Sequence, residues 1–198
     1  MHEHLTDPYV REANRRGYRS RAAFKLMELV ERDRLLRPAM TVVDLGAAPG
    51  SWSQVLHERL GAKARIVAID LLPMNGIAGV QFIQGDFASE EGLAAVESAL
   101  AGARADLVVC DMSPNLSGID SVDQARGMGL ADLALEFACS HLQPGGALVV
   151  KVFQGVGLDD FQRSVRSRFS KVYLRKPKAS RDRSREHYLV AKDLRAEE

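Results

Sequence analysis

The stretch Thr41-Val42-Val43-Asp44-Leu45-Gly46-Ala47-Ala48-Pro49-Gly50 joins a run of β-branched and apolar residues to a glycine-containing turn. β-branched residues favour strands. The segment that follows, residues 51–60, is expected to be a helix that ends at Gly61. Glycines between a strand and a helix let a ligand approach the backbone closely. The stretch therefore predicts the first strand–turn–helix unit of an α/β sheet, with a ligand at its turn.

Strands and helices alternate along the rest of the chain. This alternation predicts a mostly parallel sheet of seven strands, with helices on both faces and an antiparallel edge strand where the last two strands form a hairpin. We find no internal repeat or domain boundary, so residues 1–198 should form one domain, with residues 1–19 as a mobile basic arm. The expected strands are 41–45, 65–70, 80–86, 105–111, 147–152, 170–175 and 186–192, and the expected helices are 20–30, 51–60, 89–101, 122–141 and 158–168.

Charge is unevenly distributed although the net charge is only +1. Residues 38–162 carry 6 Lys and Arg against 15 Asp and Glu, whereas residues 163–185 carry 10 against the single acid Asp182. Residues 11–25 carry 6 basic residues and one acid. Basic segments that flank an acidic middle indicate a polyanionic partner, although a solvated basic tail is the alternative.

The bulk composition is that of an ordinary cytoplasmic protein. Apolar residues make up 46% of the chain, yet no apolar run approaches the roughly 20 residues of a membrane span. The polar start of the chain lacks the apolar stretch of a signal peptide. Cys110 and Cys139 lie in apolar surroundings and are expected to be buried, reduced thiols. We therefore expect a cytoplasmic protein with no membrane association.

Acidic residues recur where the predicted strands end. Asp70 ends the second strand, twenty residues after Gly50, and Asp86 ends the third. In open α/β sheets ligands bind at the carboxyl ends of the strands, and an acid after the second strand accepts hydrogen bonds from the ribose hydroxyls of an adenosine. Asp86 can contact the adenine amino group. The pattern predicts an adenosine-containing cofactor.

The turn itself favours a cofactor without phosphate groups. A dinucleotide site calls for G-x-G-x-x-G, whose backbone amides hold a pyrophosphate. Here Gly46 and Gly50 are separated by Ala47, Ala48 and Pro49, and proline removes one amide donor. S-adenosylmethionine fits such a turn. Trp52 follows directly and either shapes the methionine pocket or packs in the core.

Lys151 is the residue that indicates the reaction. It stands within the apolar run Leu148-Val149-Val150-Lys151-Val152-Phe153, where a charged side chain is costly to bury. A ribose 2′-hydroxyl needs a base to take its proton during methyl transfer. Lysine can serve if burial and a second cation lower its pKa. Lys25 is the candidate cation, and Asp111 and Glu186 would orient the two ammonium groups.

Other methyltransferase chemistries are less well matched. Carbon methylation of pyrimidines usually needs a cysteine nucleophile, but Cys110 is expected to point away from the face that Asp111 uses. Amino-nitrogen methylation usually shows an Asn/Asp-Pro-Pro-aromatic motif. The corresponding Asp111-Met112-Ser113-Pro114-Asn115 lacks the second proline and the aromatic residue.

The chain resembles the bacterial FtsJ/RrmJ heat-shock family of RNA 2′-O-methyltransferases over nearly its whole length. The resemblance implies a Rossmann-like S-adenosylmethionine-dependent methyltransferase that modifies a uridine ribose in the A-loop of 23S ribosomal RNA, within the large subunit. It implies a catalytic tetrad of Lys25, Asp111, Lys151 and Glu186, with Lys151 as the proton acceptor. One departure is Ser51, where a second glycine is expected. The matching motifs are Ser20-Arg21-Ala22-Ala23-Phe24-Lys25-Leu26, Val43-Asp44-Leu45-Gly46-Ala47-Ala48-Pro49-Gly50, Leu71-Leu72-Pro73-Met74, Gly85-Asp86-Phe87, Asp111-Met112-Ser113-Pro114-Asn115 and Ser180-Arg181-Asp182-Arg183-Ser184-Arg185-Glu186.

The expected site residues fall into two further groups. Cofactor contacts are expected from Gly46, Ala48, Pro49, Gly50, Trp52, Asp70, Asp86 and Asp111. Phosphate contacts, which are salt-dependent and largely blind to sequence, are expected from Arg16, Arg19, Arg21, Lys176, Lys178, Arg181, Arg183 and Arg185. Tyr18 and Tyr188 either stack on a base or pack in the fold.

Several alternatives remain open at this point. A nicotinamide-dependent oxidoreductase would leave Lys25 and Glu186 unexplained, and an RNA-binding ribosome-assembly factor would not need a buried lysine. A 2′-O-methyltransferase for another RNA would share the tetrad, although an mRNA cap enzyme should also offer an aromatic slot. We expect no metal and a monomer.

Overall fold

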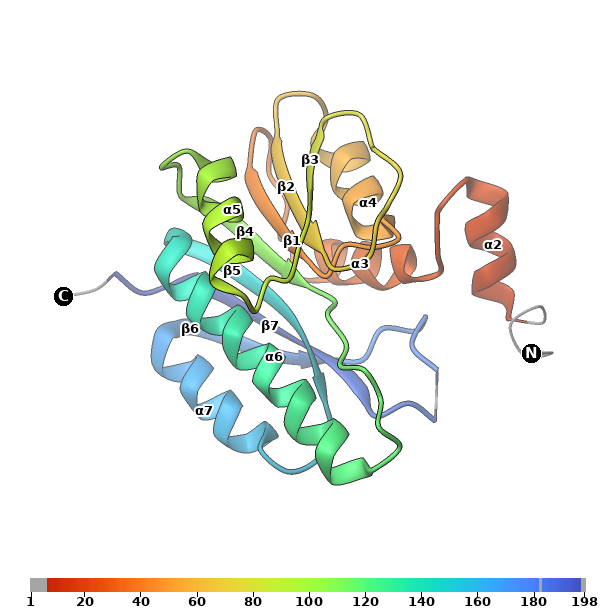
Figure 1. Cartoon of the computed structure of the whole chain (residues 1–198), viewed down its shortest axis with the longest axis vertical. Coiled ribbons are helices and arrows are strands. Elements are labelled where there is room, and N and C mark those ends of the chain that lie inside the picture. Colours follow the sequence, from red (N-terminus) through yellow and green to blue (C-terminus); the bar gives the residue numbers. More distant parts are fainter. Residues whose placement is uncertain (1–6, 182, 197–198) are drawn as a thin grey trace.

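The computed structural model describes residues 7–181 and 183–196 as a sheet covered by helices on both faces (Figure 1). The strands are β1 (Thr41–Leu45), β2 (Arg65–Asp70), β3 (Val80–Gln84), β4 (Ala105–Cys110), β5 (Leu142–Phe153), β6 (Phe169–Arg175) and β7 (Glu186–Leu194). The helices are α2 (Pro8–Arg16), α3 (Ala22–Arg32), α4 (Ser51–Leu60), α5 (Glu90–Leu100), α6 (Asp120–His141) and α7 (Leu158–Arg168).

The sheet has seven strands in the order β3-β2-β1-β4-β5-β7-β6. Strands β1 to β5 pair in parallel, whereas β7 is antiparallel to both β5 and β6. The predicted fold class is confirmed, and the antiparallel edge takes the form of the β6–β7 hairpin, in which β7 is the reversed strand. The carboxyl ends of β1 to β5 therefore meet at one edge.

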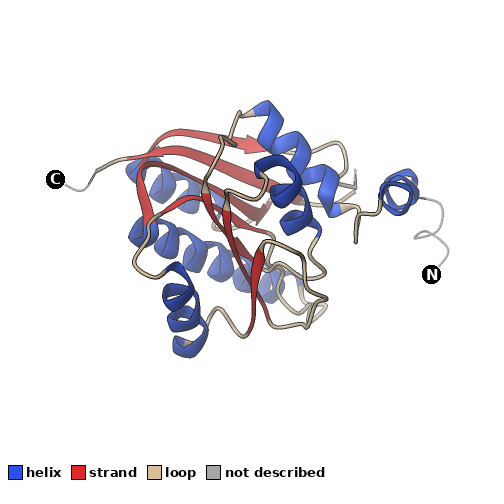
Figure 2. Cartoon of the chain, turned by 90° about the horizontal axis from the view of Figure 1, so that it is seen from above, coloured by secondary structure: helices blue, strands red, loops and turns tan. Residues whose placement is uncertain are grey.

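Helices lie on both faces of the sheet, as the view from above shows (Figure 2), and each helical layer packs an apolar cluster against it. Helices α5, α6 and α7 bury residues such as Val96, Phe137 and Phe161 on one face. Helices α3 and α4 bury Leu26 and Leu56 on the other. Strands buried on both faces read as continuous apolar runs, which is why β1, β4 and the 147–152 part of β5 were predictable from sequence. β5 itself begins earlier, at Leu142, so residues 144–146 belong to the strand and not to the expected turn. No helix in the described part of the chain is long and apolar enough to cross a membrane.

The first described segment is a helix that the sequence prediction missed. The expected arm over residues 1–19 contains α2, which Asp7 caps by accepting from the Tyr9 amide at 2.9 Å. Gly17 ends the helix in the left-handed conformation (φ 77°). The ring of Tyr9 packs 5.8 Å from that of Phe24 on α3. These capping residues are the signals that could have revealed the helix. Residues 1–6 lie outside the described part.

A buried ion pair joins the end of α3 to the edge of the sheet. Arg175 donates from Nη2 to Asp33 Oδ1 at 2.6 Å and from Nε to Oδ2 at 3.1 Å, and the Asp33 side chain is only 4% exposed. Lys192 donates from Nζ to the Asp33 carbonyl at 2.7 Å. The carboxylate raises the pKa of the Arg175 guanidinium. This cluster holds the β6–β7 hairpin against the N-terminal half of the chain.

We expect Asp33→Ala to lower the free energy of unfolding by about 2 kcal/mol, because it leaves a partly buried guanidinium without its carboxylate. Urea unfolding followed by circular dichroism measures the change. The matched control is Asp160→Ala, since Asp160 pairs with Arg163 on the surface, where a loss of at most about 0.5 kcal/mol is expected. Equal effects of the two substitutions would contradict this role for the Asp33 cluster.

Candidate active site

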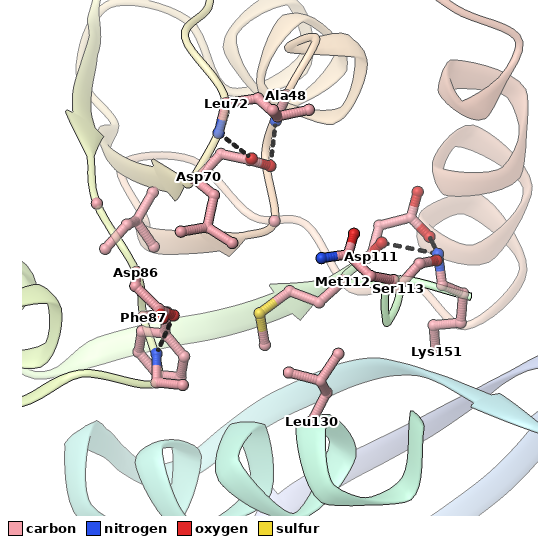
Figure 3. A pocket seen from close by; sticks show the side chains of 16 residues that line it. Ala48, Asp70, Leu72, Asp86, Phe87, Asp111, Met112, Ser113, Leu130 and Lys151 are labelled. Carbon is pink, nitrogen blue, oxygen red and sulfur yellow. Dashed lines mark hydrogen bonds and ion pairs between the residues drawn. The ribbon is translucent and has the colours of Figure 1, made fainter. Parts of the chain in front are cut away.

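A cavity of about 480 Å³ opens at the carboxyl edge of the sheet (Figure 3). A cavity of this size can hold a cofactor. Its walls come from the segments that follow β1, β2, β3 and β4 and from β5, so residues far apart in sequence meet here. Of the predicted site residues, it is lined by Gly46, Ala48, Asp70, Asp86, Asp111 and Lys151.

The turn after β1 fits closely beneath the segment after β4. Gly46 has φ 77°, and a Cβ atom there would lie 2.8 Å from the Met112 backbone nitrogen. Only glycine allows this approach. The amides of Gly46 and Ala47 both donate to the Ile69 carbonyl, at 2.9 and 3.1 Å. The turn is therefore held rigidly against the end of β2.

Asp70 is fixed by the backbone on both of its oxygens. Oδ2 accepts from the Ala48 amide at 2.9 Å and Oδ1 from the Leu72 amide at 2.8 Å (Figure 3). Each carboxylate oxygen can accept a second hydrogen bond. The carboxylate can thus receive the two hydroxyls of a ribose without moving.

Asp86 lies beyond the third strand, because β3 ends at Gln84 rather than continuing to residue 86. Its Oδ1 accepts from the Ala88 amide at 2.9 Å (Figure 3). A Cβ atom at Gly92 would lie 1.9 Å from the Asp86 carbonyl oxygen, so α5 packs directly on this backbone. Asp86 is therefore held on the cavity wall by α5, which can pack this closely only because residue 92 is glycine.

Three residues predicted to contact the cofactor do not line the cavity. Pro49 lies against Arg19 in a separate depression, and the Arg19 guanidinium would lie 2.6 Å from a Cβ atom at Gly50. Trp52 is 2% exposed and donates from Nε1 to the Ala22 carbonyl at 2.9 Å. These residues support the turn from behind, and a direct contact from them stays a prediction.

The four residues of the predicted tetrad come together beside the cavity. Lys151 Nζ lies 3.0 Å from Asp111 Oδ1 and donates to the Asp111 carbonyl at 2.7 Å. Lys25 Nζ lies 2.6 Å from Glu186 Oε1. The side chains of Lys25 and Lys151 are only 10% and 6% exposed. Each buried ammonium group therefore has a carboxylate partner, as burial of a charge requires.

Tyr188 joins these two ion pairs, a role that sequence analysis missed. Its hydroxyl donates to Asp111 Oδ1 at 2.6 Å and lies 3.4 Å from Lys25 Nζ. The ring is fully buried, so the suggestion that Tyr188 stacks on a base is wrong. Burial and the nearby carboxylates raise the pKa of the Tyr188 hydroxyl well above its usual value. The available signal was the strand period, since Glu186 and Tyr188 share a face.

Asp44 is a further acid at the base of the site. It is fully buried in β1, its Oδ2 accepts from the Ser53 hydroxyl at 2.7 Å, and its Oδ1 has no hydrogen-bond partner. Burial raises the pKa of Asp44 to about 7, and the charges of Asp111 and Asp70 add to the shift, while the Ser53 hydrogen bond opposes it.

Cys110 is excluded as a nucleophile by its surroundings. It is 2% exposed, and burial raises the pKa of its thiol to about 12. A thiolate, which is the reactive form, is therefore strongly disfavoured. Cys110 and Cys139 are not joined by a disulfide.

The predicted RNA-binding residues fall into two structural groups. Arg19 donates to the carbonyls of Pro49, Asn75 and Gly76, at 2.9, 2.7 and 3.0 Å, and Arg21 pairs with Asp7, so both are engaged by the protein itself. The remaining six are exposed on α2 or on the loop between β6 and β7, which lie toward the same side of Figure 1: Arg16, Lys176, Lys178, Arg181, Arg183 and Arg185.

The loop between β6 and β7 is anchored to the tetrad. Ala179 and Ser180 are buried, and the Ser180 hydroxyl donates to Glu186 Oε1 at 3.0 Å, the same oxygen that Lys25 contacts. The Lys178 amide donates to Glu28 Oε2 at 2.8 Å. Residues 178–180 of this loop are thus held in place next to the buried lysines.

Comparison with known proteins gives consistent matches. A family model described as FtsJ-like methyltransferase matches residues 18–194. A protein named ribosomal RNA large subunit methyltransferase E from Azoarcus sp. (strain BH72) is 60% identical over 195 residues, covering 98% of this chain and 95% of that protein. One of the same name from Marinobacter nauticus is 53% identical over 195 residues, covering 98% and 94%. The solved structure of a protein described as a ribosomal RNA methyltransferase from Plasmodium falciparum has a TM-score of 0.81 and 28% identity, covering 91% of this chain and 100% of that one.

The raised pKa of Asp44, about 7 against an ordinary 3.8, predicts a pH-dependent stability. Between these values the folded state holds a proton that the unfolded state releases, so this group stabilises the fold less as pH rises from about 4 to 7. Asp44→Asn removes this dependence while keeping an acceptor for Ser53. The free energy of unfolding of Asp44→Asn, relative to that of the unaltered chain, should therefore rise between pH 4 and pH 7 by an amount on the order of a few kcal/mol. Urea unfolding at several pH values measures the difference, and parallel pH curves would argue against the shift.

Proposed function

The chain belongs to the FtsJ-like methyltransferase family, and from that premise we propose that it transfers a methyl group from S-adenosylmethionine to a uridine ribose 2′-hydroxyl in the A-loop of 23S ribosomal RNA. The observation that carries this proposal is the pairing of the buried Lys151 with Asp111 at the edge of the cavity. Relatives named ribosomal RNA large subunit methyltransferase E, matched over nearly their full length, support the large-subunit RNA as substrate.

The charge of the cavity supports S-adenosylmethionine over a dinucleotide. Among the lining residues, Asp70, Asp86 and Asp111 are acidic and Lys151 is the one basic residue. Such a lining favours a cation and disfavours a pyrophosphate. Asp70 would accept the ribose hydroxyls and Asp86 would contact the adenine amino group. When bound, the cofactor supplies a methyl group carried on a positively charged sulfur.

Lys151 would act as the base for the 2′-hydroxyl. Lys151 would first release its ammonium proton to solvent; the neutral amine would then accept the hydroxyl proton at Nζ, which leaves the oxygen as a stronger nucleophile for in-line methyl transfer. Asp111 holds the Lys151 side chain through its carboxylate and its carbonyl oxygen, and would stabilise the ammonium that forms. Through Tyr188, the Lys25–Glu186 pair fixes the orientation of Asp111.

The exposed basic residues would hold the RNA backbone close to the tetrad. The loop between β6 and β7 presents Arg181, Arg183 and Arg185 directly before Glu186. Arg185 pairs with Asp120 at 3.3 Å on the surface, a contact that costs little to exchange for a phosphate. These contacts would position the RNA without reading its sequence. The shape of the folded RNA would then select the target.

Lys151→Ala should lower methyl transfer at least about 100-fold, because it removes the proton acceptor. Affinity for S-adenosylmethionine should stay nearly unchanged. The assay is labelled methyl transfer to large subunits from cells that lack this protein, with the modified nucleotide mapped. Lys63→Ala, at an exposed lysine beyond α4, is the control and should behave as the unaltered chain. Substantial activity in Lys151→Ala would exclude Lys151 as the base.

Asp70→Ala should weaken binding of S-adenosylmethionine by about tenfold or more, since charged hydrogen bonds to the ribose are lost. Isothermal calorimetry measures the affinity, and thermal unfolding monitors the turn that Asp70 also holds. Asp159→Ala, at an exposed acid on α7, is the matched control. If calorimetry gives the same affinity for Asp70→Ala and the control, the cofactor does not bind at Asp70.

A further inference from the structure

The most exposed large apolar side chains of the described residues gather at the carboxyl edge of the sheet. Leu71 and Leu72 follow β2 and line the cavity at 61% and 64% exposure. Leu116 and Ile119 follow β4 at 79% and 58%, and Val156 follows β5 at 89%. The other three exposed apolar side chains in the described part are only 36–37% exposed. Exposed apolar groups gathered on one face indicate an interaction site.

The loop that carries Leu116 and Ile119 is fastened to the start of α6. Asp123 accepts from the amide and the hydroxyl of Ser117, both at 2.7 Å, and from the Gly118 amide at 3.1 Å. These hydrogen bonds lower the pKa of Asp123. Arg126 donates from Nη1 to the Asn115 carbonyl at 3.2 Å. These hydrogen bonds fix the backbone of the loop in a conformation that leaves Leu116 and Ile119 exposed.

The loop that carries Val156 is fastened to the same helix. Gln124 donates from Nε2 to the carbonyls of Phe153 and Val156, at 3.1 and 3.0 Å. A Cβ atom at Gly127 would lie 3.0 Å from the Phe153 ring, so the end of β5 packs closely on α6. Leu116, Ile119 and Val156 thus surround the first turns of α6, and we call these three side chains the aliphatic rim.

We propose that the aliphatic rim receives an unstacked RNA base next to the methylated ribose. This inference rests on the proposed function. With the adenosine at Asp70 and Asp86 and the reacting ribose at Lys151, the base attached to that ribose or its neighbour must leave the cavity on another side. The loop after β4 lines the cavity through Ser113 and Asn115 and continues directly into the rim.

The chemistry of the rim suits a nucleotide. Apolar side chains can pack on the flat face of a base, and enzymes that act on a flipped-out nucleotide hold its base between aromatic or apolar side chains. Two exposed arginines lie near the first turns of α6. Arg126 belongs to this helix, and Arg185 contacts its first residue, Asp120, at 3.3 Å. Apolar contacts for a base and guanidinium groups for the adjoining phosphates thus occur together.

The test compares the triple variant Leu116→Ser, Ile119→Ser, Val156→Ser with the unaltered chain on large subunits from cells that lack this protein. Loss of base packing should raise KM for the subunit about tenfold or more. The S-adenosylmethionine affinity should remain unchanged and the Tm should not fall, since the rim residues neither line the cavity nor pack in the core and serine is a favourable N-cap for α6 at position 119. Leu93→Ser, at an exposed leucine on α5, is the control. An unchanged KM in the triple variant overturns the proposal.

A second measurement identifies the molecule that contacts the aliphatic rim and does not depend on methyl transfer. A photo-crosslinking benzophenone amino acid at position 119, in complex with the subunit, should attach to RNA. Attachment only to ribosomal protein, or to neither, overturns the base-binding role. If the unaltered chain methylates no ribose 2′-hydroxyl, the proposed function fails, and the crosslink then still reports whether the rim contacts RNA.

Discussion

The arrangement of the molecule depends on neutralising two buried ammonium groups. Lys25 comes from α3 and Lys151 from β5, and their carboxylate partners come from the first residue of β7 and the segment after β4. These partners meet only because β7 inserts antiparallel beside β5, where Tyr188 pairs with Lys151 in register. Without this insertion, at least one lysine would be buried without a counterion, which costs several kcal/mol. Sheet topology and active-site chemistry therefore follow from one constraint.

Most of the fold could be predicted from local sequence patterns. The bounds of β1, β2, α4 and α7 match the expected ranges, because apolar runs and capping residues mark them locally. The grouping of Asp70, Asp86 and Asp111 could be predicted because parallel strands end at a common edge. The strand period places Tyr188 on the face of Glu186, but the hydrogen bond from Tyr188 to Asp111 depends on the pairing of β7 with a strand more than thirty residues earlier, which no local pattern reveals. The hydrogen bonds of Arg19 could not be predicted either, because their acceptors lie in loops, which have no periodic sequence pattern.

The two sides of the glycine turn after β1 have different structural roles. Its inner side, Gly46 and Ala48, faces the cavity, whereas its outer side is clamped by Arg19, which also holds the carbonyls of the loop after β2. Arg19 thereby joins the two segments that hold Asp70 in place. A basic residue expected from charge alone to contact RNA instead holds the turn after β1 and the loop after β2 beside the cavity.

The anchoring of the β6–β7 loop at Ala179 and Ser180 divides its residues into two classes. The outward basic side chains are exposed to solvent, although Lys176 also donates from Nζ to the Ser184 carbonyl at 3.0 Å, whereas Pro177, Ala179 and Ser180 are buried and Ser180 donates to Glu186. If the outward positions hold RNA as proposed, a descendant of this chain could vary Lys178, Arg181 and Arg185 without altering the buried contacts of the loop. The inward positions would have to be inherited together with the lysine pair, so under the proposed function RNA affinity and chemistry can evolve on separate parts of one short loop.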